Sequence, residues 1–163
     1  MALSDPNFEP RQRDYARPEL CNCAAIRQAA RHVSQFYDQC MAPVGLRVSQ
    51  FSVLARLRRL GPMTINALAH ELVMDRTTLG RNIKPLEREG LIEVRPGHTD
   101  RRARELHLTE AGLARLRAGM AHWSAAQTRF EEVFGTARAA ELRGLMRDVS
   151  ASEFGAAANT AMT

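Results

Sequence analysis

A stripe of hydroxyl and cationic side chains lies along one side of a helix that we expect over residues 76–89. At about 100° per residue these side chains point away from the apolar side of the same helix. The stripe consists of Thr77, Arg81, Lys84 and Arg88, and the apolar side of Leu79, Ile83 and Leu86. Arginine and lysine donate hydrogen bonds to guanine edges, and threonine contacts phosphate or the thymine methyl group. The stripe therefore suits contact with nucleic acid, and the plainer alternative is a solvated helix face.

The residues before this helix favour the nucleic-acid interpretation. Residues 65–72 have apolar side chains at helical spacing, and Asp75 is a candidate N-cap for the helix that follows. A short helix, a three-residue turn and a capped second helix make a helix-turn-helix, whose second helix reads bases with its N-terminal part. We expect Arg76, Thr77 and Thr78 to enter the major groove together with Arg81 and Lys84.

Pro85 falls inside the expected reading helix. Proline removes one backbone hydrogen bond and usually bends a helix. We expect a kink there, with the reading segment ending near Lys84 and the second half packing Leu86 into the core.

A second basic feature follows in a loop between two expected strands. Residues 91–95 and 104–109 alternate apolar and polar side chains, which is typical of an antiparallel pair. The connector over residues 96–103 contains Arg101 and Arg102, and Arg104 follows it. Loop arginines can enter a narrow minor groove, where the negative potential is strongest. Asp100 is placed to hold one of these arginines.

Long amphipathic helices are expected on both sides of this small lobe. Apolar residues recur at three- and four-residue steps over residues 23–40, over 109–134, and again after residue 136. Such helices offer more apolar surface than one chain can cover, which favours a helical dimer interface. We expect a mainly α fold: a winged helix-turn-helix lobe with a two- to three-stranded antiparallel wing, flanked by long dimerisation helices.

The expected domain plan follows from these elements. Residues 1–19 should form a flexible N-terminal arm, because they contain three prolines and lack periodicity. Residues 20–163 should form a single domain. Within it, 20–45 and 110–163 would be dimerisation helices and 46–109 the DNA-binding lobe.

Composition agrees with a polyanionic partner. The chain has 163 residues, a formal net charge of +5 and a pI of about 9.8, so it attracts nucleic acid over long range. The N-terminus lacks the apolar stretch of a secretory signal, and no apolar run is long enough to cross a membrane. We therefore expect a cytoplasmic protein that does not engage a membrane.

Two segments resemble the MarR family of winged helix-turn-helix regulators. The sequence DRRARELHLTEAG over residues 100–112 is similar to the family's wing signature, and residues 68–92 resemble its helix-turn-helix. The resemblance implies a homodimer that binds a pseudo-palindromic operator, usually as a repressor that an effector releases. It also implies that Arg102 enters the minor groove and that Asp100 is its ion-pair partner. Val73 stands where the family commonly has glycine in the turn.

The signal that such a regulator would sense is open at this stage. A small organic effector would bind between the dimer helices and the reading lobe, where Tyr37, Phe51 and Trp123 could line a pocket or simply form core. The alternative is a redox sensor, since the placement of Cys23 and Tyr37 is similar to that in the peroxide-sensing OhrR branch of the family. Cys21 and Cys23 lie near the expected start of the first helix, where a thiol can be activated.

Other classes of function have little support in the sequence. Cys21 and Cys23 lack the two-residue spacer of zinc sites, and the histidines form no ligand pair. No phosphate-binding glycine loop or nucleophile elbow is present. We expect neither an enzyme nor a cofactor or metal site. A winged helix used only for protein contacts is a distant alternative.

Overall fold

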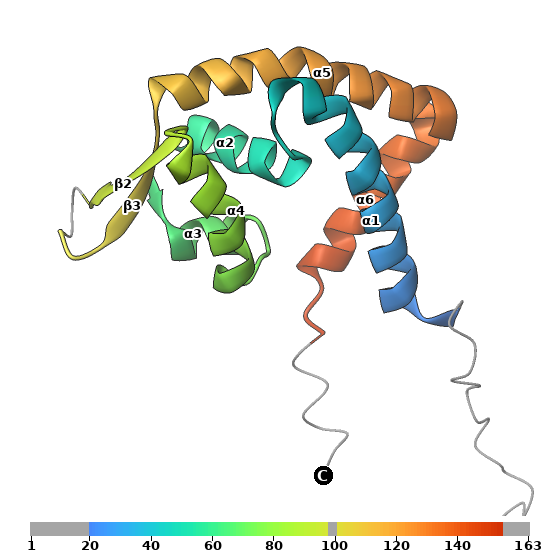
Figure 1. Cartoon of the computed structure of the whole chain (residues 1–163). Helices are drawn as coiled ribbons and strands as arrows, with labels where there is room; N and C mark the ends of the chain where they lie inside the picture. The colour runs from blue at the N-terminus through green and yellow to red at the C-terminus, as the bar shows by residue number, and fades with distance from the viewer. Residues whose placement is uncertain (1–19, 98–100, 155–163) are drawn as a thin grey trace, which may run out of the picture. The chain divides into compact units, whose positions relative to one another are not determined.

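The computed structural model describes residues 20–97 and 101–154, and Figure 1 shows the order of their elements. The expected arm over residues 1–19 and the wing residue Asp100 lie outside this described part. The helices are α1 (Asn22–Met41), η2 (Ala42–Val44, a 3₁₀ turn), α2 (Val48–Leu60), α3 (Ile65–Glu71), α4 (Arg76–Arg88), α5 (Glu110–Phe134) and α6 (Thr136–Ala151). The strands are β1 (Met63–Thr64), β2 (Ile92–Pro96) and β3 (Arg104–Leu108). The expected mainly α, winged helix-turn-helix fold is confirmed.

Contacts divide the chain within α1, between Phe36 and Tyr37. In the first unit, the part of α1 before Tyr37 has exposed side chains except for Val33 and Phe36, which are half-buried. The second unit runs from Tyr37 onward and contains the helix-turn-helix, the wing, α5 and α6.

The core of the second unit lies among α2, α3, α4 and the sheet. Its fully buried side chains include Leu54, Leu68, Leu79 and Leu86, one or more from each of the three helices. An N-cap residue starts α3 where the sequence predicts this helix. Thr64 accepts a hydrogen bond from the Ala67 amide at 3.2 Å, which caps α3.

The wing is a three-stranded antiparallel sheet in the order β1-β3-β2. Met63 pairs with Leu106, and Val94 pairs with Leu106 from the other side. Leu106 is therefore the buried centre of the sheet, while β2 and β3 project from the lobe as a hairpin (Figure 1). The short strand β1 also ends at the residue that caps α3, so the sheet fixes where the helix-turn-helix begins.

The start of α5 is fastened to the root of the wing. The Thr109 hydroxyl donates to the Gly90 carbonyl at 2.7 Å and accepts from the Gly112 amide at 3.0 Å. A Cβ on Gly112 would overlap the Leu91 carbonyl oxygen, so only glycine permits this approach. These contacts fix the start of α5 against the root of the wing.

Val73 adopts an unusual backbone conformation in the turn between α3 and α4. Its φ is 51° and its side chain is 77% exposed. A left-handed conformation is costly for a β-branched residue, and burial gives this side chain no compensation. The turn thus adopts a conformation that glycine favours, with a β-branched residue in its place.

We predict that Val73→Gly raises the free energy of unfolding by about 1 kcal/mol, because it relieves this backbone cost. Val73→Asn should also stabilise the protein, since asparagine tolerates the same conformation, whereas Val73→Ile should not. Urea unfolding of the three variants measures the effect. Equal stability of all three would show that Val73 is unstrained.

Candidate nucleic-acid interface

The two sides of α4 face in opposite directions, as the sequence predicts. Leu79, Ile83 and Leu86 are at most 5% exposed and pack into the core. The candidate DNA contacts Thr77, Arg81 and Lys84 lie on the other side and are exposed, and the candidates Arg76 and Thr78 in the first turn of the helix are exposed as well. Arg88 extends the same exposed stripe. The stripe of Thr77, Arg81, Lys84 and Arg88 therefore presents cations and hydroxyls outward, while Glu87, also exposed, lies off this stripe.

Asp75 caps α4 at its N-terminus. Its Oδ1 accepts a hydrogen bond from the Thr78 amide at 2.8 Å. The hydrogen bonds from the Thr78 side chain and amide lower the pKa of Asp75, because they favour the charged carboxylate. The cap therefore stabilises the helix at neutral pH, and this contribution is lost as the pH falls through the lowered pKa. It also fixes the first turn, from which Arg76, Thr77 and Thr78 project.

Pro85 does not end the helix. α4 continues through it to Arg88, and Leu86 is 1% exposed. The expected burial of Leu86 is confirmed, while the expected kink at Pro85 stays a prediction.

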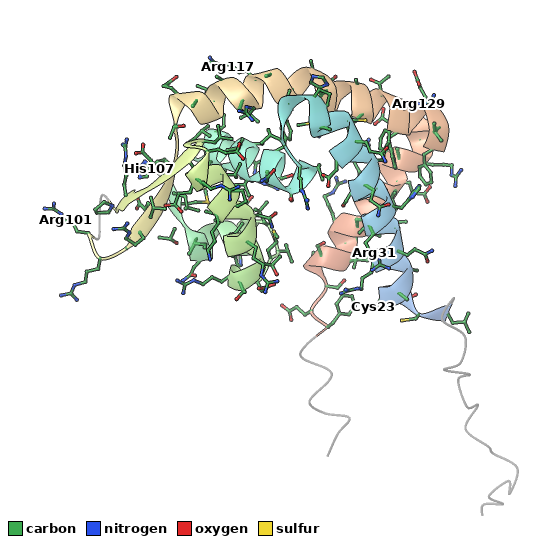
Figure 2. All side chains as sticks on the ribbon, viewed as in Figure 1. Cys23, Arg31, Arg101, His107, Arg117 and Arg129 are labelled. Atoms are coloured by element: carbon green, nitrogen blue, oxygen red, sulfur yellow. The ribbon has the colours of Figure 1, made fainter. Side chains whose placement is uncertain are left out.

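The wing presents a second group of arginines. Arg101, Arg102 and Arg104 have exposed side chains, and Figure 2 shows Arg101 at the outer end of the hairpin. The Gly97 amide donates to the Ala103 carbonyl at 2.8 Å, which closes the base of the connector. The expected pairing of Asp100 with Arg102 lies outside the described residues.

The three aromatic candidates for an effector pocket take part in packing. Phe51 and Trp123 stack with ring centroids 6.3 Å apart, and Phe51 is buried. The buried Tyr37 donates its hydroxyl hydrogen to Gln127 Oε1, one turn along α5 from Trp123. Burial is the main cause that raises the pKa of Tyr37, with Glu131 adding to it. A role for these residues in effector binding stays a prediction.

An open cavity of about 260 Å³ lies elsewhere, at the root of the wing. It is lined by the end of α2, the end of β3 and the start of α5, and none of the three aromatic candidates borders it.

The redox candidates lie at the start of α1. Cys21 and Cys23 are exposed free thiols, and Cys40 is half-buried. The Cys21 sulfur lies 3.4 Å from the Ala24 amide, in the position of an N-cap. Figure 2 shows the Cys23 side chain in the first turn of the helix.

Two sets of polar contacts, one to α4 and one to the residue after it, were missed at the level of sequence. Ser49 in α2 bonds to Asn82 in α4 at 2.9 Å. Arg115 in α5 donates to the Val44 carbonyl at 3.0 Å and lies 3.8 Å from Glu89 just after α4. Both join residues far apart in the chain, and no local pattern marks such partners.

The described residues form neither a metal-binding cluster nor a helix that could cross a membrane. Within residues 20–97 and 101–154, no three His, Cys, Asp or Glu side chains gather as a metal site would require. In the same part of the chain no helix has the length and apolar character needed to span a bilayer.

Comparison with known proteins places the lobe in a family. Residues 46–103 match the model of the MarR family. An uncharacterised HTH-type transcriptional regulator of Bacillus subtilis, YwoH, is 38% identical over 85 residues, which is 52% of this chain and 61% of that protein. This match therefore covers less than two thirds of the curated relative.

Solved structures extend the match over most of the chain. The transcriptional regulator MosR of M. tuberculosis in complex with DNA is 32% identical, with a TM-score of 0.66 over 81% of this chain and 99% of that one. The transcriptional repressor CouR bound to a DNA duplex is 26% identical, with a TM-score of 0.72 over 80% of this chain and 92% of that one. The family signature over the lobe and the fold on both sides of it agree: this chain belongs to the MarR family.

Proposed function

We propose that this protein is a DNA-binding transcription regulator that binds a pseudo-palindromic operator as a homodimer. The observation that carries the proposal is the two-sided α4, whose apolar residues are buried while its cations and hydroxyls are exposed. The wing adds exposed arginines on the hairpin that follows. MosR and CouR, which share the fold, are described in complex with DNA.

In this account the two basic elements have different roles. Arg76, Thr77, Thr78, Arg81 and Lys84 enter the major groove, where arginine and lysine can read guanine. Arg101 and Arg102 reach the neighbouring minor groove from the wing, with Asp100 orienting Arg102. Most of the affinity would come from phosphate contacts and would depend strongly on salt.

The dimer is supported by apolar surface that the second unit leaves exposed. On α6 only Ala139 is buried, while Leu145, Met146 and Val149 are 53%, 37% and 37% exposed. Apolar surface of this extent on a helix usually marks an interaction site. A second copy, joined through residues 20–45 and 110–163, would cover it and pair the two reading helices.

We predict that Arg81→Ala and Arg102→Ala each weaken operator binding roughly tenfold or more, because each removes a charged groove contact. Melting temperatures should change little, since both side chains are exposed. Electrophoretic mobility shifts with an operator selected by the wild-type protein from random duplexes measure the loss.

Arg117→Ala is the matched control. Arg117 is an exposed arginine on α5, and Figure 2 shows it away from both α4 and the hairpin. It removes the same charge and should leave affinity nearly unchanged. Equal losses of affinity in all three variants would show that net charge alone, and not contact with the grooves, causes the loss. DNA binding by the wild-type protein that does not weaken as salt rises would contradict binding through arginines and favour a protein-interaction module instead.

The regulator is proposed to act as a repressor that a small organic effector releases, with Tyr37, Phe51 and Trp123 as candidate pocket residues. Oxidation of Cys23 is the second candidate signal, supported by the exposure of Cys21 and Cys23. In that reaction the thiolate attacks an organic hydroperoxide, the sulfur is oxidised to sulfenic acid, and the hydroperoxide is reduced to an alcohol.

Operator release separates the two signals. We predict that aromatic acids dissociate the reduced wild-type protein and the Cys23→Ser variant equally, because no thiol takes part. Cys40→Ser serves as the control for loss of a cysteine elsewhere. Release by organic hydroperoxide that Cys23→Ser abolishes and Cys40→Ser retains would instead identify the thiol as the sensor.

A further inference from the structure

A hydrogen bond joins the first turn of α2 to the middle of α4. The Ser49 hydroxyl donates to Asn82 Oδ1 at 2.9 Å, and Asn82 Nδ2 donates to the Thr78 carbonyl at 3.1 Å. The amide of Asn82 is thus bonded on both sides, once to α2 and once to its own helix. The Thr78 amide in turn donates to Asp75 at 2.8 Å. The contact therefore reaches the turn of α4 that carries the first candidate DNA contacts.

The place of Asn82 on α4 gives this bond a specific mechanical effect. At about 100° per residue, Asn82 lies beside the apolar side of the helix and away from the cationic stripe. The apolar contacts of Leu79, Ile83 and Leu86 hold α4 against the core, but hydrophobic attraction has no preferred direction. A directional hydrogen bond on the flank resists rotation of the helix about its axis.

Ser49 is itself held on a well-fixed element. The Val48 amide, which has no acceptor within α2, donates to Asp38 Oδ1 at 2.7 Å. Asp38 lies in the last turns of α1, so this bond anchors the start of α2. Phe51, Val53 and Leu54 then bury the helix in the core. The bond to Asn82 therefore fixes the rotation of α4 relative to α2, which is itself anchored at its first turn.

We propose that Ser49 and Asn82 are positioning residues for operator recognition, an inference that rests on the proposed function. Their hydrogen bond sets the rotation of α4 at which Thr77 and Arg81 face the base edges. Neither residue is among the candidate DNA contacts. Base readout depends on the orientation of the contacting side chains, whereas phosphate contacts tolerate small rotations. Loss of the bond should therefore lower affinity for the operator more than affinity for unrelated DNA.

The test compares both affinities in matched serine variants. The operator probe is a duplex that the full-length wild-type protein selects from a random pool, and the second probe is a scrambled duplex. Ser49→Ala should weaken operator binding about fivefold and change binding to the scrambled duplex less than about twofold. Ser49→Thr keeps the hydroxyl and should restore operator affinity.

Ser52→Ala is the control, because Ser52 lies one turn along α2 and donates only to the Val48 carbonyl, at 2.9 Å, in the bonds described. It should bind the operator as the wild-type protein does. Asn82→Ala provides a second route to the same loss, and the double variant Ser49→Ala/Asn82→Ala should bind no more weakly than the weaker single variant.

Three results would overturn the inference: unchanged operator affinity in Ser49→Ala, an equal loss on both duplexes, or additive losses in the double variant. Each of these arises with a wild-type protein that selects an operator, so the proposed function survives them. A wild-type protein that selects no duplex removes the proposed function and this inference together.

Discussion

Burial of the apolar side of α4 is the constraint on which the rest of the structure depends. Leu79 and Leu86 occupy the centre of the lobe, so the side of the helix that carries them has to face the core. Thr77 and Arg81 must then face solvent. The apolar side of α4 packs against α2, α3 and the sheet. The N-caps Thr64 and Asp75 set where α3 and α4 begin.

Much of this arrangement could be predicted from sequence because its causes are local. The spacing of apolar residues located α4 and its two sides, and Asp75 marked its start. Contacts between distant residues left no such signal: the pairing of Met63 with Leu106 and the bond between Ser49 and Asn82 depend on the folded chain. The left-handed conformation of Val73 goes against the preference of that residue, and it was not predicted from the sequence.

The lobe of the second unit has a well-buried core, whereas on α6 only Ala139 is buried. Leu145 and Val149 remain exposed, while the leucines at the centre of the lobe, such as Leu54 and Leu79, are fully buried. The proposed pairing of two copies would explain this contrast: the lobe has its own core, whereas α6 would be covered by the second copy. Two linked lobes would also recognise a longer DNA site than one α4 can contact, which is how small reading domains gain specificity.

The most direct test of this account measures the protein–DNA complex itself. Native mass spectrometry of the wild-type protein on its selected operator should find two chains per duplex. Affinity should then fall sharply when about five base pairs are inserted between the half-sites, because half a helical turn places them on opposite faces of the DNA. One chain per duplex, or affinity that ignores the insertion, would contradict the account.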